Sequence, residues 1–311
     1  MSTVKVARDF MRRKLVTLSA DTEVLAGVAR LLRDNISGAS VIDDHGQYLG
    51  VFSEKCSMNA MTEVVEVAEA CSLYSGATRE FMKSELFTLT PDIGVFEAID
   101  QVLKRRISGA PVVDENQKYL GIFSEKTAMR VLVSAVYDQL PGTNVGSYMN
   151  VDRNRIIGDE DTLVQVAHKF QQTPYRRLPV LHHGRLAGQV SRRDVIRAEH
   201  GVAVEARKLG LRSGSDERLQ VATRVRMVGE WMDKNALTIE PETDLLTVAM
   251  AFLNSPYRRL PVVEHGKLVG QISRRDLLEA AAEILRPKPK KHHAAALYLS
   301  PLVDSAPPSL S

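Results

Sequence analysis

Two stretches in the second half of the chain are almost identical: GQVSRRD at Gly188–Asp194 and GQISRRD at Gly270–Asp276. In each, apolar positions lead into a serine followed by a charged run, which is typical of a strand that ends where a helix begins. Two related stretches come earlier, GVFSEKC from Gly50 and GIFSEKT from Gly121. A glycine followed three residues later by serine therefore occurs four times, which indicates four copies of one structural unit.

Two further landmarks precede each of these stretches in a constant order. The first is an aromatic residue followed by methionine, in RDFM from Arg8, REFM from Arg79, GSYM from Gly146 and GEWM from Gly229. The second is an apolar run, in ISGASVID from Ile36, ISGAPVVD from Ile107, YRRLPVLH from Tyr175 and YRRLPVVE from Tyr257. We therefore predict four repeats and a disordered tail, with these bounds: 4–61, 77–139, 145–200, 224–286 and, for the tail, 287–311.

The hydrophobic pattern within each repeat predicts the order β-α-β-β-α and hence an α+β fold. Apolar residues keep one helical face in the fourth repeat at Leu245, Val248, Ala249 and Phe252, and in the first at Leu25, Val28, Ala29 and Leu32. Polar turns between the two β-rich runs predict hairpins, and the last helix begins at the recurring serine.

The repeats fall into two classes. The first two share ISGA and FSEK, and the last two share YRRLPV and SRRD. One such unit has too small a core to be stable alone, so we expect the repeats to pair. The shared motifs predict two modules, the first repeat paired with the second and the third with the fourth.

Composition narrows the class of protein. The chain has 311 residues, 44% hydrophobic and 25% charged, with a net charge of +3 and two cysteines. These values are typical of a soluble cytoplasmic protein without a disulfide framework, a signal peptide or a membrane-spanning segment. No phosphate-binding G-x-x-x-x-G-K-[ST] loop, CxxC or HExxH motif occurs, so we expect neither an enzyme nor a metal site.

The SRRD motif has two interpretations. Ser191 and Ser273 stand where helix caps belong, and S-x-x-D resembles a capping box. The arginine pairs Arg192-Arg193 and Arg274-Arg275, however, place positive charge at an already electropositive helix start, which favours a bound anion. In the first two repeats Glu54-Lys55 and Glu125-Lys126 occupy these positions, and there we expect the acid simply to complement the helix dipole.

A second set of arginines precedes an inner strand: Arg176, Arg177, Arg258 and Arg259. They are either a solvated corner or phosphate ligands, because the planar guanidinium suits bidentate contacts with phosphate. Since four arginines lie at matching positions in both repeats, the phosphate interpretation is favoured.

With these motifs the chain resembles the CBS domain family over about residues 4–286. The resemblance implies β-α-β-β-α units paired into Bateman modules with pseudo-two-fold symmetry. It also implies regulatory binding of AMP, ADP, ATP or S-adenosylmethionine in clefts between paired repeats, with no cofactor required.

The resemblance also implies roles for individual residues. The family's ribose-binding carboxylate matches Asp194 and Asp276, and its preceding serine matches Ser191 and Ser273. Its phosphate-binding residues, which precede the second strand, match Arg176, Arg177, Arg258 and Arg259. Its first-strand residues, which frame the base, match Ile157, Thr238 and Ile239. Cys56 and Thr127 stand where the carboxylate is expected in the first two repeats, so we expect nucleotide binding in the second half only.

These observations predict a freestanding sensor that binds an adenine nucleotide in repeats three and four and signals to a partner protein. We also expect a homodimer. Two alternatives remain open: a structural or oligomerisation scaffold with vestigial sites, and a nucleic-acid-binding regulator that uses the basic segment 201–226. The second is disfavoured because the cations of that segment are not interleaved with aromatic residues.

Overall fold

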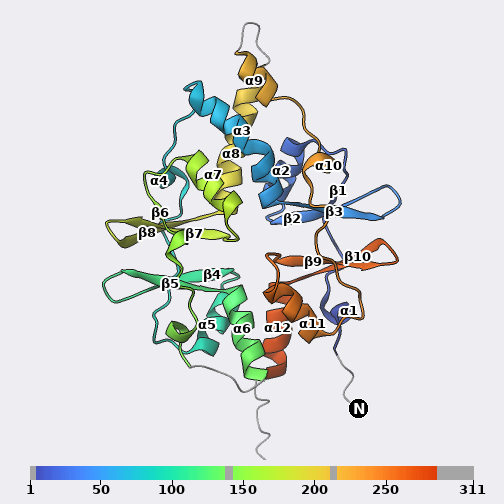
Figure 1. Cartoon of the computed structure of the whole chain (residues 1–311). Helices are drawn as coiled ribbons and strands as arrows, with labels where there is room; N and C mark the ends of the chain where they lie inside the picture. The colour runs from blue at the N-terminus through green and yellow to red at the C-terminus, as the bar shows by residue number, and fades with distance from the viewer. Residues whose placement is uncertain (1–4, 137–142, 211–215, 286–311) are drawn as a thin grey trace, which may run out of the picture.

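The computed structural model describes residues 5–136, 143–210 and 216–285 (Figure 1). The predicted disordered tail lies outside these residues. The first repeat comprises α1 (Ala7–Phe10), β1 (Thr17–Leu18), α2 (Val24–Arg33), β2 (Gly38–Ile42), β3 (Tyr48–Ser53) and α3 (Glu54–Ala70). The second comprises α4 (Thr78–Phe81), α5 (Val95–Lys104), β4 (Gly109–Val113), β5 (Tyr119–Ser124) and α6 (Glu125–Val136).

The third and fourth repeats follow the same order. The third comprises two 3-10 helices (Val145–Ser147 and Arg153–Arg155), β6 (Ile157–Gly158), α7 (Leu163–Gln172), β7 (Arg177–His182), β8 (Arg185–Ser191) and α8 (Arg192–Gly210). The fourth comprises α10 (Val228–Trp231), α11 (Leu245–Leu253), β9 (Arg259–Glu264), β10 (Lys267–Ser273) and α12 (Arg274–Leu285), and α9 (Glu217–Ala222) precedes it. The α+β fold of four β-α-β-β-α repeats is therefore confirmed.

Each repeat builds a small sheet from an antiparallel hairpin. In the first and third repeats a short strand also pairs in parallel with the hairpin, β1 with β2 and β6 with β7. In the other two that strand is reduced to one bridge, Leu89 to Val112 and Ile239 to Val262. The first strand of each repeat is thus the shortest element of its sheet.

The buried helix faces follow the predicted spacing with one shift. Val248, Ala249 and Phe252 of α11 are buried as expected. In α2 the buried side chains include Val24, Val28 and Leu31, whereas Ala29 is exposed. The buried face of α2 is therefore rotated from the predicted one, because Val24 at its first turn packs inward.

The segment that leads into each repeat packs on a different repeat. In the first repeat the Ala7 amide donates to the Thr243 carbonyl (2.8 Å), and in the fourth the Val228 amide donates to the Thr22 carbonyl (2.8 Å). The second and third repeats exchange their segments in the same way, through bonds from the Thr78 amide to Asp161 and from the Val145 amide to Ile93. The exchanged segments define two pairs of repeats, one with four and two with three.

This exchange explains why two sequence landmarks recur together. A Cβ atom added to Gly50 would lie 2.6 Å from the Asp233 carbonyl oxygen, and one added to Gly121 would lie 2.8 Å from that of Asn150. Asp233 and Asn150 directly follow the methionines of the leading segments. The recurring glycine is therefore needed for close approach of the partner's leading segment.

The chain forms two pairs of repeats, but the predicted partners are wrong. Backbone bridges join Gln47 to Lys267 and Lys118 to Arg185, so the hairpins of repeats one and four meet, as do those of two and three. Shared motifs misled the prediction because they reflect similarity of sequence, whereas pairing depends on which leading segment docks on which sheet.

Helices join the two pairs into a ring. In Figure 1 the long helices of repeats one and three form the upper layer, with α3 packed against α7 and α8. The long helices of repeats two and four form the lower layer, with α6 packed against α11 and α12. Each layer has its own core, centred on Phe52 and Phe170 above and on Phe123 and Phe252 below. The sheets lie between the layers.

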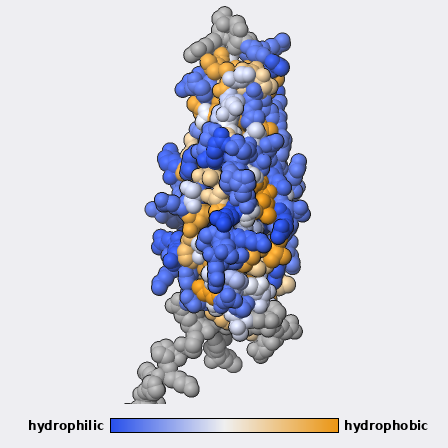
Figure 2. Space-filling view, turned by 90° about the vertical axis from the view of Figure 1, so that its left-hand side faces the viewer, coloured by the Kyte–Doolittle hydropathy of each residue, from blue (hydrophilic) through white to orange (hydrophobic). Residues whose placement is uncertain are grey.

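The ring is flattened. Turned by 90°, the molecule is narrow, and the edge that it presents carries mostly hydrophilic side chains (Figure 2). Beyond the predicted end of the first repeat the chain continues as α3 to Ala70, and beyond that of the third repeat it continues as α8 to Gly210. Within the described ranges, no helix is both long and apolar enough to cross a membrane.

Candidate functional site

The starts of α3, α6, α8 and α12 converge at the centre of the ring. Each helix has the recurring serine before its first residue, and the serine hydroxyl accepts a hydrogen bond from the amide three residues on. The donors are the amides of Cys56 (3.3 Å), Thr127 (3.2 Å), Asp194 (3.3 Å) and Asp276 (3.2 Å). The capping role predicted for the serines is therefore confirmed in all four repeats.

Four of the eight predicted arginines bind two glutamates at this centre. Glu54 accepts from Arg176 at 2.7 Å and lies 3.4 Å from Arg193. Glu125 accepts from Arg258 at 3.0 Å and lies 3.3 Å from Arg275. Both carboxylates are buried, with 4% and 2% of their surface exposed. The glutamates of the SEK motif therefore do more than complement a helix dipole, because each holds a pair of arginines from another repeat.

Arg192 and Arg274 have a structural contact in common. Each guanidinium donates to two carbonyl oxygens at the end of the preceding helix, of Phe170 (3.2 Å) and Thr173 (3.0 Å) for Arg192. Arg274 does the same at Phe252 and Ser255, both at 3.1 Å. Burial lowers the pKa of both arginines to about 10, so they remain cations at neutral pH.

The remaining two arginines differ in their partners. Arg177 donates to the Ser108 hydroxyl and to the Gln189 side chain, both at 2.9 Å. Arg259 has no hydrogen bond or ion pair to any described residue, and burial lowers its pKa to about 10, with Arg258 and Arg176 adding to the shift. A cation without a direct partner beside like charges is typical of an anion-binding region.

The two predicted ribose carboxylates are engaged within the chain. Asp194 Oδ2 accepts from the Ser191 amide (2.9 Å) and hydroxyl (2.6 Å), and Asp276 Oδ2 accepts from the Ser273 amide (2.8 Å) and hydroxyl (2.6 Å). Asp276 Oδ1 additionally accepts two bonds from Arg12, at 2.9 and 2.7 Å. Their ribose role stays a prediction.

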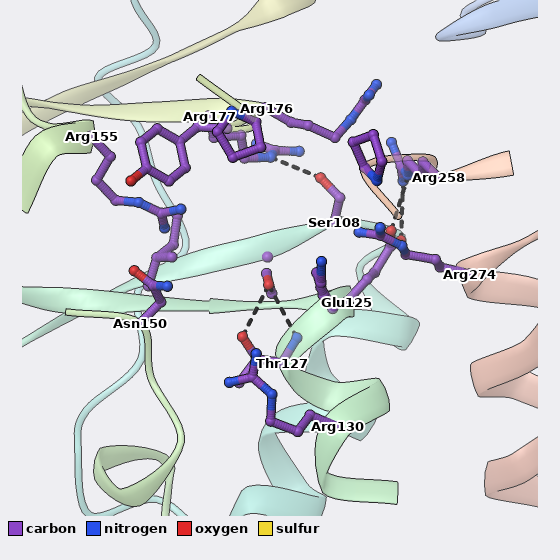
Figure 3. A pocket seen from close by; sticks show the side chains of 17 residues that line it. Ser108, Glu125, Thr127, Arg130, Asn150, Arg155, Arg176, Arg177, Arg258 and Arg274 are labelled. Atoms are coloured by element: carbon purple, nitrogen blue, oxygen red, sulfur yellow. Dashed lines mark hydrogen bonds and ion pairs between the residues drawn. The ribbon is translucent and has the colours of Figure 1, made fainter. Parts of the chain in front are cut away.

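Two cavities open onto the arginine centre, one for each pair of repeats. The first, cleft 2–3, lies between the second and third repeats and has a volume of about 260 Å³ (Figure 3). It is lined by 17 residues, of which seven are cationic: Lys126, Arg130, Arg155, Arg176, Arg177, Arg258 and Arg274. Glu125 is the one acid among them, and Thr127 is the residue at the predicted carboxylate position.

The second cavity, cleft 1–4, lies between the first and fourth repeats and has a volume of about 640 Å³. Its cations are Lys55, Arg176, Arg192, Arg258 and Arg259. Its outer part contains two aromatic residues, Trp231 and Tyr257, and the carboxylate of Asp233, which accepts a hydrogen bond from the Tyr257 hydroxyl (2.9 Å). Cys56 occupies the predicted carboxylate position.

Arg176 and Arg258 line both cavities, as do Pro174 and Pro256. Asp194, Asp276, Ile157, Thr238 and Ile239 line neither. The exchanged pairing therefore brings the arginines of the second half to cavities that contain Cys56 and Thr127. The sequence led us to expect the opposite combination, arginines and aspartates in one cleft.

A scan of the sequence against family models matches the CBS domain at residues 7–55, 78–134, 145–201 and 228–283. The chain belongs to the CBS domain family. Among curated proteins it is 23% identical over 281 residues to the uncharacterized protein MJ1225 of Methanocaldococcus jannaschii, covering 86% of each chain. It is 25% identical to the CBS domain-containing protein CBSX1 of Arabidopsis thaliana, covering 67% of this chain and 64% of that protein.

Solved structures of other CBS proteins include two with adenosine ligands. One is CBSX2 in complex with AMP, with a TM-score of 0.38, 25% identity, and coverage of 41% of this chain and 98% of that one. Another is the CBS domain pair of MJ0100 with 5′-methylthioadenosine and S-adenosyl-L-methionine, with a TM-score of 0.35, 20% identity, and coverage of 40% and 97%. An inosine-5′-monophosphate dehydrogenase of Aquifex aeolicus is also similar, and the chain spans 34% of its length.

Several residues of the two CBS clefts were missed from the sequence. Glu54 and Glu125 stand where Arg192 and Arg274 stand in the other class of repeat, and this charge reversal at one position was the available signal for an ion pair between classes. No sequence pattern indicated that Arg155 would line a cavity, because its position there depends on the pairing of repeats two and three. Among the described residues no cluster of metal ligands occurs.

Proposed function

We propose that this CBS protein is a regulatory sensor that binds adenine nucleotides in cleft 1–4 and cleft 2–3, with the phosphates at the shared arginine centre. One observation carries the proposal: Arg176 and Arg258 line both cavities while each is tethered to a single buried glutamate. Four arginines share two carboxylates there, which leaves guanidinium groups free to engage phosphate oxygens.

The electrostatics of the centre support an anionic ligand. Burial lowers the pKa of Arg176, and although Glu54 opposes the shift, Arg258 adds to it. A phosphate would bring negative charge to this crowded positive region and would therefore be bound more tightly as its charge increases. The helix starts that converge there add backbone dipoles of the same sign.

The choice of an adenine nucleotide rests on the relatives. A CBS protein bound to AMP and a CBS pair bound to S-adenosyl-L-methionine are both known structures. In cleft 1–4 the rings of Trp231 and Tyr257 offer stacking surfaces for a base, and the Asp233 carboxylate can accept a hydrogen bond from an amino group. The predicted homodimer and the regulated partner protein belong to this proposal.

A matched pair of double variants tests the proposal. Arg176→Ala with Arg258→Ala leaves Arg193 on Glu54 and Arg275 on Glu125, so no buried carboxylate loses its last partner. Arg185→Ala with Lys267→Ala removes the same charge from the exposed hairpins. In the wild type and the hairpin variant, ATP at about 100 times Kd should stabilise the fold by about 2.7 kcal/mol.

The central variant should lose most of this stabilisation, measured as the change in melting temperature with AMP, ADP, ATP and S-adenosylmethionine. An equal response from the central and hairpin variants would show that the centre is not the phosphate site. Absence of any response in the wild type would favour the scaffold hypothesis. That alternative has one observation in its favour: the glutamate–arginine pairs tie the second half of the chain to the first without any ligand.

A further inference from the structure

The outer end of cleft 2–3 contains a buried cation that makes no ion pair with any described carboxylate. Arg155 is 8% exposed, and its Nε and Nη1 atoms have no hydrogen-bond partner among the described residues. Its guanidinium lies over the Tyr175 ring, 4.4 Å from the centroid. The Asp152 carboxylate nearby accepts a hydrogen bond from the Tyr175 hydroxyl, and Arg155 helps to lower the pKa of Asp152 without forming a direct ion pair with it. A buried, unpaired guanidinium is costly unless an anion binds it.

A second cation lies below the middle of the same cavity (Figure 3). Arg130 follows Thr127 by one turn of α6 and lines the cavity. Figure 3 shows Arg155 beside Asn150 on one side of the cavity, and Arg258 and Arg274 on the other, with Thr127 and Arg130 below. Cleft 2–3 is therefore cationic at both ends.

The position between the two ends is neutral. Thr127 occupies the place that Asp194 and Asp276 have in the other class of repeat, and its hydroxyl lies 3.0 Å from the Ser124 hydroxyl. A carboxylate there would repel a phosphate bound near Arg130, whereas a hydroxyl does not. Burial lowers the pKa of the neighbouring Lys126, and the charges of Arg274 and Arg130 add to the shift, which indicates excess positive charge along this wall.

Cleft 1–4 lacks this second cationic end. Asn59 stands at the position of Arg130, and Asp233 stands at the position of Asn150. The position that matches Arg155, two residues before the bridging isoleucine, is Leu237, which does not line the cavity. The two cavities thus share one cationic centre and differ in the charge of their outer ends.

We propose that cleft 2–3 binds a nucleotide with a phosphate at each end, one on the 5′ position at the arginine centre and one on a ribose hydroxyl beside Arg130 and Arg155. The inference rests on the proposed nucleotide function and adds the class of ligand. Cleft 1–4, with an acid at its outer end, discriminates against such a ligand.

Isomeric nucleotides test the placement of the phosphates. ADP, adenosine 3′,5′-bisphosphate and adenosine 2′,5′-bisphosphate contain the same atoms and differ only in where the second phosphate is attached. Titration calorimetry of the whole chain should show a site that prefers one ribose-phosphorylated isomer over ADP by roughly tenfold, the size of one charge-assisted hydrogen bond. Trp231, the single tryptophan and a residue of cleft 1–4, reports that cavity separately, and its fluorescence should not show this preference.

Matched variants assign the preference to the cavity. Arg130 is exposed, so Arg130→Asn should fold normally and abolish the preference, and Arg155→Leu should do the same. Asn59→Arg is the reciprocal change in cleft 1–4. It should weaken the discrimination of this cleft against the ribose-phosphorylated isomers, as measured by Trp231 fluorescence. Equal affinity for the three isomers, or a preference that survives in Arg130→Asn, would overturn the inference. If ADP also fails to bind, the proposed function fails with it; if ADP binds and depends on Arg176 and Arg258, only the inference fails.

Discussion

Cleft 1–4 and cleft 2–3 are built from the same elements and share Arg176 and Arg258, yet their outer ends are opposite in character. Cleft 1–4 ends in Trp231, Tyr257 and the carboxylate of Asp233. Cleft 2–3 ends in Arg155 and has a further cation, Arg130, below Thr127. The comparison teaches that the two clefts share one cationic centre and differ in the charge of their outer ends, and in our proposal it is the outer ends that select the ligand.

The helices behind the two clefts differ as well. Thr62 of α3, the helix that starts in cleft 1–4, donates to the buried Glu199 carboxylate of α8 at 2.8 Å. The equivalent positions in α6 and α12 are Val133 and Ala281, which pack on the lower core. An ionisable contact therefore supports cleft 1–4, and an apolar contact supports cleft 2–3.

The largest expected effect concerns the feature that the clefts share. Glu54→Ala leaves Arg176 and Arg193 without their carboxylate, and Glu125→Ala does the same to Arg258 and Arg275. Removing one partner of a buried ion pair typically destabilises a fold by about 3–5 kcal/mol. We expect each variant to lose stability of this order in urea denaturation, and inorganic phosphate to restore part of it in both.

Glu242→Ala is the control, because this exposed glutamate pairs with Arg8 on the surface and should contribute less than about 1 kcal/mol. If the central variants are no less stable than this control, the arginines of the centre do not need Glu54 and Glu125 to balance their charge. If phosphate rescues one variant alone, the two clefts do not share a phosphate site.

An effect of intermediate size concerns the helix behind cleft 1–4. Burial raises the pKa of Glu199 to about 8, above the ordinary value of 4.5. Between these two values the folded chain holds a proton that the unfolded chain releases, so stability falls as pH rises from about 5 to about 8, by at most ~1.4 kcal/mol per pH unit, and then levels off.

Glu199→Gln should remove this contribution and flatten the pH profile of the free energy of unfolding. Denaturation series at several pH values between 5 and 9 measure the difference between wild type and variant. Parallel profiles for the two proteins would show that Glu199 does not titrate in this interval. The helix pair behind cleft 1–4 would then not differ from the pair behind cleft 2–3 in the pH dependence of its stability.

The smallest expected effect separates the two predicted ribose carboxylates. Arg12, whose side chain is 66% exposed, forms an ion pair with Asp276. The corresponding residue beside the third repeat is Lys83, and its side chain forms no ion pair with Asp194. Arg12→Ala should change stability by less than about 1 kcal/mol and free Asp276 Oδ1. If Asp276 binds ribose, the variant should bind more nucleotide per chain in calorimetry than the Lys83→Ala control. An unchanged stoichiometry in Arg12→Ala would leave Asp276 as a helix cap alone.

The sequence alone determined the repeat unit and most of its local structure. The serine caps, the hairpins and the starts of the four converging helices follow from short-range patterns, because a cap or a turn is satisfied by residues a few positions away. At the second repeat's hairpin, where the turn lacks glycine, Gln117 adopts the left-handed conformation with φ of 62° instead. The matching arginines of the third and fourth repeats were also readable from their repetition.

Only the tertiary structure decided which repeats pair, and with it the composition of every cleft. The motifs are local and nearly alike, so they contain no information about which leading segment docks on which sheet. Because repeat one pairs with four and two with three, the arginines of one class meet the glutamates, Cys56 and Thr127 of the other. Arg155 lines cleft 2–3 for the same reason: its burial depends on contacts between segments that are far apart in the sequence.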